Sequence, residues 1–155
     1  MVKLSAIRIA GLMDEDFFLY AEEAEWCARL KKVGNLCIFG NVKVVHLQGI
    51  SANETFSSTG KGYYNLFDKK GKQIILSNLV RIRKQYGLFW FLLVLFVYSL
   101  TIPVFLSGIV LSGFLSKAHR KYRLSDFLGF CRNIFFIWSK MPRIVLNRPY
   151  FYKAL

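Results

Sequence analysis

The sequence predicts an α/β region followed by membrane-associated helices. Residues 20–33 have the apolar spacing of an amphipathic helix, and residues 36–39 and 42–47 form short apolar runs typical of strands. Residues 88–115 contain no charged side chain and exceed the roughly 20 residues that cross a bilayer as a helix. The chain is therefore expected to divide into three zones: a compact α/β piece over residues 1–50, a polar loop and basic helix over 51–86, and a membrane anchor over 87–155.

The composition favours a membrane surface as the partner of this chain. Hydrophobic residues make up 54% of the 155 residues, yet the formal net charge is +13. The excess cations flank the apolar run, which favours an anionic membrane over nucleic acid. Cys27, Cys37 and Cys131 form no C-x-x-C pair, so we expect neither a zinc site nor a disulfide framework, and a reducing cytoplasmic compartment is the default.

The helix expected over residues 20–33 has one apolar face. Four residues share that face at about 100° per residue: Tyr20, Ala24, Cys27 and Leu30. Glu23 falls within the same arc. Glu22 and Glu25 fall on the opposite side, where Glu25 can pair with Arg29 one turn later. We therefore expect Glu23 to face the interior and both other glutamates to remain solvated.

The apolar run over residues 88–115 allows two arrangements. Pro103 lies near its middle, which is compatible with one kinked span or with a re-entrant hairpin of two short arms. Both flanks are basic, so the positive-inside rule does not decide, although the symmetry slightly favours the hairpin. The later stretch over residues 127–141 is apolar and aromatic but contains Arg132 and Lys140, which predicts an interfacial helix.

A motif over residues 11–49 resembles a known enzyme family. Residues 11–34 read GLMDEDFFLYAEEAEWCARLKKVG, and residues 43–49 read KVVHLQG. The succession of a DEDFFLY string, an acidic pair, R-L-x-x-x-G and V-x-H is similar to the C-terminal half of the catalytic domain in family 2 glycosyltransferases, especially the rhamnosyltransferase-like branch. The resemblance implies that residues 1–50 are the C-terminal part of a GT-A nucleotide-diphospho-sugar transferase domain, whose nucleotide-binding half is absent here. Residues 51–86 would then supply the acceptor loop.

The resemblance also implies an activity and its partners. Such an enzyme transfers a hexose or deoxyhexose with inversion, from a nucleotide-sugar donor to a surface polysaccharide or polyprenyl-linked acceptor, at the cytoplasmic face of the cell membrane. Inversion requires a carboxylate that takes the proton of the acceptor hydroxyl. Glu23 matches that general base, and Glu22 is the alternative. The resemblance assigns acceptor binding to three further acids: Asp14, Asp16 and Glu25.

A divalent metal, magnesium or manganese, is implied by the same resemblance. His46 matches a histidine that approaches the metal and the diphosphate in related enzymes. Imidazole binds these ions only within an oxygen-rich set, and the other ligands would come from an Asp-x-Asp motif on the absent half. Asp14-Glu15-Asp16 has that spacing by letters only, so we expect the chain alone to bind no metal.

Two other interpretations of the chain stay open. It is either a truncated, catalytically inactive membrane-protein remnant, or one half of a split transferase whose separately encoded N-terminal half docks on residues 1–50. The same residues also have ordinary explanations, because acids in the first turn of a helix complement its dipole and a lone histidine is commonly structural. The basic stretches over residues 69–84 and 117–123 are either solvated faces beside a membrane segment or contacts for lipid phosphates or a polyprenyl diphosphate.

Overall fold

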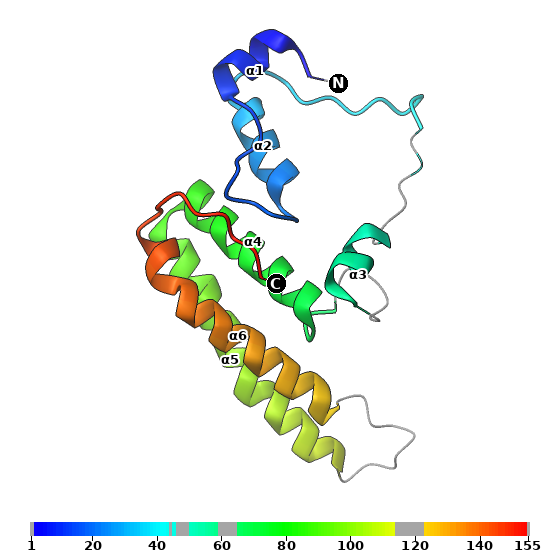
Figure 1. Ribbon diagram of the computed structural model, residues 1–155, viewed down its shortest axis with the longest axis vertical. Coiled ribbons are helices and arrows are strands. Elements are labelled where there is room, and N and C mark those ends of the chain that lie inside the picture. Colours follow the sequence, from blue (N-terminus) through cyan, green and yellow to red (C-terminus); the bar gives the residue numbers. More distant parts are fainter. Residues whose placement is uncertain (1, 44, 46–49, 59–64, 114–122, 155) are drawn as a thin grey trace.

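The computed structural model describes residues 2–43, 45, 50–58, 65–113 and 123–154 (Figure 1). These residues form six helices: α1 (Leu4–Ala10), α2 (Glu22–Lys31), α3 (Ile50–Phe56), α4 (Lys69–Tyr86), α5 (Leu88–Gly113) and α6 (Leu124–Val145). They contain no strand, and an isolated parallel bridge joins Phe17 to Tyr152. The described part of the chain is therefore helical.

Helices α4, α5 and α6 pack together and form the centre of the apolar core (Figure 1). α5 and α6 run antiparallel, because Trp138 of α6 donates to Ser99 of α5 at 3.1 Å, whereas Phe127 packs against Phe105 farther along α5. All three helices contribute side chains with almost no exposed surface: Ile75, Leu76, Leu79, Phe91, Leu95, Ile134 and Ile137. Their spacing of three and four residues gives each helix one apolar stripe that faces the others.

α4 has a defined beginning and end. The Asp68 carboxylate accepts a hydrogen bond from the Gly71 amide at 2.9 Å, which satisfies an amide that has no partner within the helix. Gly87 follows Tyr86 with φ of 90°, a left-handed conformation that glycine adopts without strain. The chain turns there directly into α5, so α5 returns along α4 (Figure 1).

Gln73 and Ser77 of α4 bind the C-terminal segment and the loop before α2. The fully buried amide of Gln73 donates to the Tyr152 carbonyl at 2.9 Å and accepts from the Ala154 amide at 2.8 Å. The neighbouring Ser77 hydroxyl donates to the Leu19 carbonyl at 2.7 Å. Buried polar groups are stable only when they are hydrogen-bonded, so these contacts fix the C-terminal segment and the loop before α2 on the same face of α4.

α5 is continuous across Pro103, so the described part of the apolar run forms one helix rather than two short arms. Within the part of the chain that the structure describes, Leu88–Leu111 is the stretch that is long and apolar enough to cross a membrane. Most of its side chains are exposed in the folded chain, including Phe89, Phe96 and Val104. Such an exposed apolar surface indicates association with lipid, because an apolar helix in the core of a soluble protein is buried.

The N-terminal part departs from the expected α/β structure. Residues 36–39 do not form the expected strand, since no described segment pairs with them and Ile38 is 100% exposed. A strand is stable only when a neighbour satisfies its amide and carbonyl groups. The second expected strand covers residues 42–47. Its positions 42, 43 and 45 have an irregular structure, and the other positions lie outside the described residues. Helix α3 replaces the beginning of the expected polar loop.

Gly129 lets α6 approach the segment before α4. A Cβ atom at this position would lie 2.2 Å from the carbonyl oxygen of Phe67. Gly129→Ala therefore forces the two segments apart, and we expect it to lower the free energy of unfolding by about 3 kcal/mol. Gly34→Ala is the matched control, because its Cβ would meet no atom within 4 Å. Thermal unfolding in detergent, followed by circular dichroism, measures both variants, and a wild-type melting temperature for Gly129→Ala would contradict this packing.

Candidate functional site

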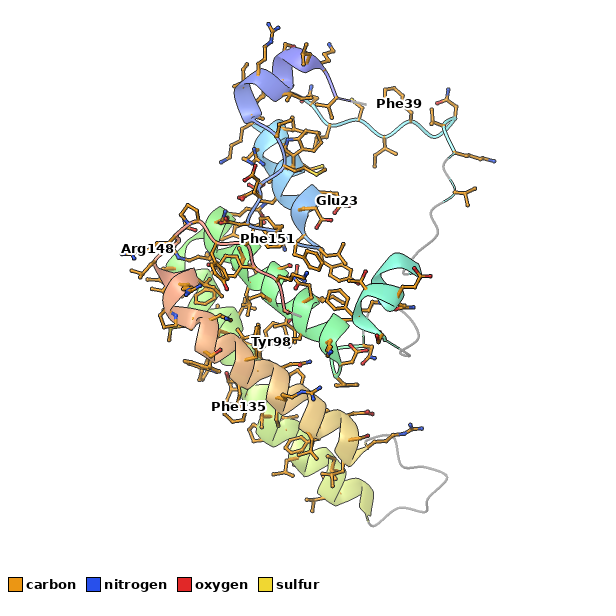
Figure 2. All side chains as sticks on the ribbon, in the orientation of Figure 1. Glu23, Phe39, Tyr98, Phe135, Arg148 and Phe151 are labelled. Atoms are coloured by element: carbon orange, nitrogen blue, oxygen red, sulfur yellow. The ribbon has the colours of Figure 1, made fainter. Side chains whose placement is uncertain are left out.

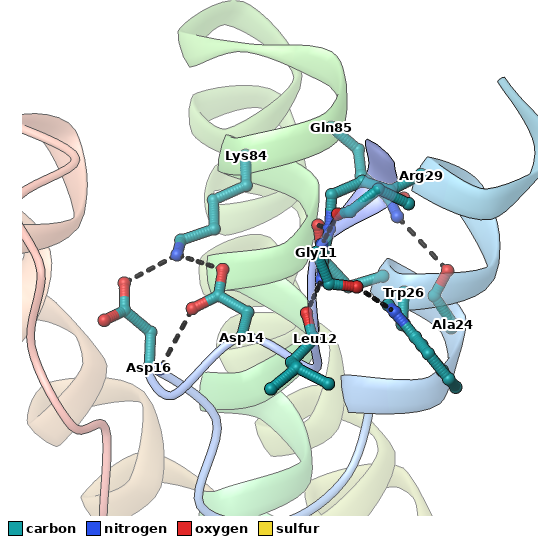
Figure 3. Close-up of polar contacts among 11 residues, drawn as sticks. Gly11, Leu12, Asp14, Asp16, Ala24, Trp26, Arg29, Lys84 and Gln85 are labelled. Carbon is teal, nitrogen blue, oxygen red and sulfur yellow. Dashed lines mark hydrogen bonds and ion pairs between the residues drawn. The ribbon is translucent and has the colours of Figure 1, made fainter. Parts of the chain in front are cut away.

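The acidic residues singled out in the sequence lie in the loop before α2 and in the first turn of that helix. This segment packs against the C-terminal half of α4 (Figure 3). The acids of this segment form separate contacts: Asp14 and Asp16 share Lys84, Glu25 pairs with Arg29, and Glu22 lies beside Glu23. His46, the expected metal ligand, lies outside the described residues.

Asp14 and Asp16 share one cation. The Lys84 ammonium of α4 lies 2.5 Å from Asp14 Oδ2 and 2.6 Å from Asp16 Oδ2 (Figure 3). The other carboxylate oxygens accept backbone amides, Asp14 from Asp16 at 3.0 Å and Asp16 from Tyr150 at 2.9 Å. These carboxylates therefore hold the loop on α4 and on the C-terminal segment, instead of facing solvent where an acceptor could bind.

The ion pair at Lys84 is charged at neutral pH. Burial alone would raise the pKa of Asp14, but its hydrogen bond to Lys84 and the charge of Lys84 outweigh burial, so the pKa falls below its ordinary value. The pKa of Lys84 responds in the opposite sense: burial would lower it, but the hydrogen bonds to Asp14 and Asp16 outweigh burial and raise it. Each partner thus stabilises the charged form of the other.

Glu25 is buried, which corrects the expectation that it is solvated. Its carboxylate forms a two-pronged ion pair with Arg29, with N–O distances of 2.8 Å. The same guanidinium donates to the carbonyls of Ala10 and Leu12. The Ala10 carbonyl lies at the C-terminal end of α1, where carbonyls lack helical partners. The need to satisfy these carbonyls draws Arg29, and with it Glu25, to the inner side of α2.

Two further side chains attach α2 to its surroundings. The Trp26 indole donates to the Gly11 carbonyl at 2.9 Å, and the Gln85 amide of α4 donates to the Ala24 carbonyl at 3.3 Å (Figure 3). Together with the Arg29 contacts, these bonds fix the orientation of α2 relative to α1 and α4. The first turn of α2 is therefore held in a defined position.

Glu22 and Glu23 exchange the environments that the sequence predicted for them. Glu23 is exposed and lies at the outer edge of α2 (Figure 2). Glu22 is half-buried, and its Oε2 atom is inaccessible and has no hydrogen-bond partner among the described residues. Burial is the main cause that raises the pKa of Glu22, and the charge and hydrogen bonding of Glu23 raise it further. The carboxyl with the raised pKa is therefore Glu22, which was the alternative choice.

The backbone immediately before these glutamates is strained. Tyr20 and Ala21 both have left-handed conformations, with φ of 70° and 68°. Residues with a Cβ atom rarely adopt this region, at a cost of about 1 kcal/mol or more each. The bonds to Leu19 and Glu25 on either side hold this turn in place. Such strain commonly accompanies functional sites, and here it sets the direction in which the Glu22–Glu23 pair projects.

No protein-family model, curated protein or solved structure matches this chain. The functional assignment therefore depends on the motif over residues 11–49 and on the geometry around Glu22. Its strongest element is a carboxyl group with a raised pKa beside a second carboxyl, on a fixed helical turn. Carboxyl groups with raised pKa values are enriched at catalytic sites.

The described residues do not fit a divalent metal. They contain no group of three or more histidine, cysteine or acidic side chains that could hold a metal ion. Asp14 and Asp16, which have the D-x-D spacing, surround the ammonium of Lys84, and that cation occupies the position a metal ion would need. Magnesium or manganese would therefore require ligands from outside the described residues.

Sequence reasoning missed the residues that organise this site. Lys84, Gln73 and Tyr150 reach the acidic loop from distant parts of the chain, at separations of 54 to 134 positions. No local pattern reveals such contacts. The sequence predicts Arg29 as the partner of Glu25. Its inward position follows from the C-terminal end of α1, and the sequence did not predict a helix over residues 4–10.

Proposed function

We propose that this chain is the membrane-associated C-terminal part of a family 2-like glycosyltransferase, in which Glu22 accepts the proton of the acceptor hydroxyl. The observation that carries the proposal is the half-buried carboxyl of Glu22 beside Glu23, with its raised pKa, on the acidic motif that resembles this family. The proposal includes a GT-A domain that is completed by a nucleotide-binding half, encoded separately or preceding this segment. The donor is a nucleotide-activated hexose or deoxyhexose, and the acceptor is a surface polysaccharide or a polyprenyl-linked glycan.

The proposed reaction is a single displacement with inversion. The acceptor oxygen forms a bond to the anomeric carbon while the bond from that carbon to the nucleoside diphosphate breaks. The hydroxyl proton moves to Glu22, whose raised pKa makes its carboxylate a stronger base than an ordinary glutamate. Any divalent metal would be held by the nucleotide-binding half, because the described residues offer no site for it.

The other acids act by positioning in this proposal. Glu23 is exposed beside Glu22, and its charge adds to the burial that raises the pKa of Glu22. Asp14 and Asp16 fix the preceding loop through Lys84, and Glu25 orients α2 through Arg29. These contacts replace the acceptor-binding roles that the resemblance implies for Asp14, Asp16 and Glu25.

Sugar transfer by the complemented chain tests the proposal. The full chain, reconstituted in membranes with a nucleotide-binding half from a related transferase, receives labelled nucleotide-sugars and a polyprenyl-linked acceptor. Release of nucleoside diphosphate together with label in the lipid-linked product supports the proposal. Absence of transfer, although both halves associate and bind the donor, would favour the inactive remnant.

Membrane association gives an independent prediction. The apolar surface of α5 should keep the full chain in the membrane fraction through a high-salt wash, because salt screens charges but does not weaken the burial of apolar surface. Sedimentation followed by immunodetection measures the retained fraction, and a detergent wash serves as the control that releases it. Recovery of the chain in the high-salt supernatant would contradict the assignment of α5.

A further inference from the structure

A group of cations surrounds one aromatic ring at the contact between α4 and α6. The Lys72 ammonium of α4 lies 4.4 Å from the centre of the Phe136 ring, and the Lys140 ammonium of α6 lies 5.3 Å from the same centre. Arg132 is one helical turn before Phe136 on α6. Both ammonium groups are therefore held by cation–π contacts with the same ring.

The charges of this cluster are not neutralised within the described chain. Burial is the main cause that lowers the pKa of Lys72, and the nearby charges that lower it further are Arg132, Lys69 and Lys140. The ion pairs of the described residues lie elsewhere, at Arg29 and at Lys84. Like charges held together repel one another, so an anion bound among them would lower the free energy of the folded chain.

The cationic cluster lies beside an exposed apolar surface of α6. The side of α6 toward α4 carries the cations and the ring: Arg132, Phe136, Lys140 and Arg143. The neighbouring outer side exposes large apolar residues, of which Trp138 also contacts Ser99 of α5: Leu124, Leu128, Phe135 and Trp138. Figure 2 labels Phe135 on the outer side of this helix. Because Arg132 follows Leu128 by four positions and precedes Phe135 by three, it borders both sides.

We propose that Lys72, Arg132 and Lys140 bind the headgroup phosphate of an anionic phospholipid, whose acyl chains lie along the exposed apolar side of α6. The cations match a phosphate in charge, and the guanidinium can donate two parallel hydrogen bonds to its oxygens. The adjoining apolar surface selects a lipid over a free phosphate, because it covers the hydrocarbon chains that a free phosphate lacks. This inference does not depend on sugar transfer.

Lipid binding by the full chain in an uncharged detergent tests this inference. The probes are phosphatidylglycerol, phosphatidylcholine with the same acyl chains, and inorganic phosphate, and native mass spectrometry measures the lipid retained. We expect phosphatidylglycerol to bind at least about tenfold more tightly than phosphatidylcholine, given the gain from several cations near an anionic headgroup. Inorganic phosphate should not displace it, and displacement at equal concentration would overturn the lipid assignment in favour of a free phosphate.

Matched variants separate the cluster from the overall charge of the chain. Replacing Lys72, Arg132 and Lys140 by glutamine should remove the preference for phosphatidylglycerol. The control variant replaces three exposed lysines of the N-terminal part by glutamine and loses the same charge: Lys3, Lys31 and Lys32. It should keep the preference within about twofold, and an equal loss in both variants would overturn the proposal.

Two milder variants keep the test decisive if the triple variant folds poorly. The double variant K72R/K140R keeps both charges and should retain the preference. Phe136→Leu removes the ring that holds the ammonium groups, and it should reduce the preference by a few fold. A wild-type preference in both the triple variant and Phe136→Leu, with unchanged circular dichroism, would overturn the site.

Discussion

Replacing Glu22 by glutamine should lower turnover of the complemented enzyme by about two to four powers of ten, the usual contribution of a general base. Glutamine keeps the shape of the side chain and removes its basicity, so donor binding should survive. The pKa of Glu22, which is raised mainly by burial, favours this residue as the base. Single-turnover measurement of the transfer step, with donor affinity measured separately, checks the expectation.

Glu23→Gln provides the comparison for this prediction. It should cost less turnover, but it should shift the acidic limb of the pH–rate profile to lower pH. The reason is that loss of the Glu23 charge lets the pKa of Glu22 fall toward its ordinary value. A larger loss from Glu23→Gln than from Glu22→Gln would restore Glu23 as the base. If neither change affects transfer, the acidic pair is structural and the proposed mechanism is wrong.

Lys84→Met should produce a large loss of stability. Methionine removes the cation and leaves the carboxylates of Asp14 and Asp16 facing each other with 23% and 12% side-chain exposure. We expect the free energy of unfolding to fall by about 3 kcal/mol, the lower end of the range for a broken buried ion pair, because all three groups keep some contact with water. Lys31→Met, at an exposed position on α2, is the matched control.

The pH dependence of stability distinguishes this ion pair from simple packing. The pKa of Asp14 is lowered on folding, so the stability that it contributes is present above its ordinary value of 3.8 and is lost as the pH falls through the folded-state value. The wild-type protein should therefore lose stability below about pH 4. The Lys84→Met variant should gain stability on mild acidification, because protonation of one carboxylate relieves the repulsion. If the free energy of unfolding changed with pH in the same way in both proteins, Lys84 would not form the ion pair.

The helices could be predicted where their signal is local. The sequence predicts a helix or a helical basic stretch in three segments, and a helix forms in each of them: α2 within residues 20–33, α4 over residues 69–84 and α6 around residues 127–141. The length and composition of the apolar run were enough to predict the helix that forms α5. A strand over residues 36–39 would need a neighbouring strand, and the periodicity of a segment cannot show whether such a neighbour exists. Within the described residues, no strand pairs with this segment.

The environments of the glutamates could not be predicted from helical angles. An angle assigns a side chain to the apolar or the polar side of its own helix, but it does not identify what packs there. Glu25 is buried because Arg29 satisfies the carbonyls of Ala10 and Leu12. Asp14 is bound to Lys84, at a separation of 70 positions. These contacts depend on the tertiary arrangement, and they reversed the expected exposure of the acids.

The hydrogen bond between the loop before α2 and the C-terminal segment can form only late in synthesis. Asp16 and its partner Tyr150 are 134 positions apart, so one emerges from the ribosome long before the other. The C-terminal segment follows α6 directly, so its contacts with α4 can form only after α5 and α6 have been synthesised. The contacts of the acidic loop with Ser77 and Lys84 of α4 can form earlier, whereas its contact with Tyr150 waits for the last part of the chain. The attachment of the acidic loop to the C-terminal segment is therefore a late step in folding.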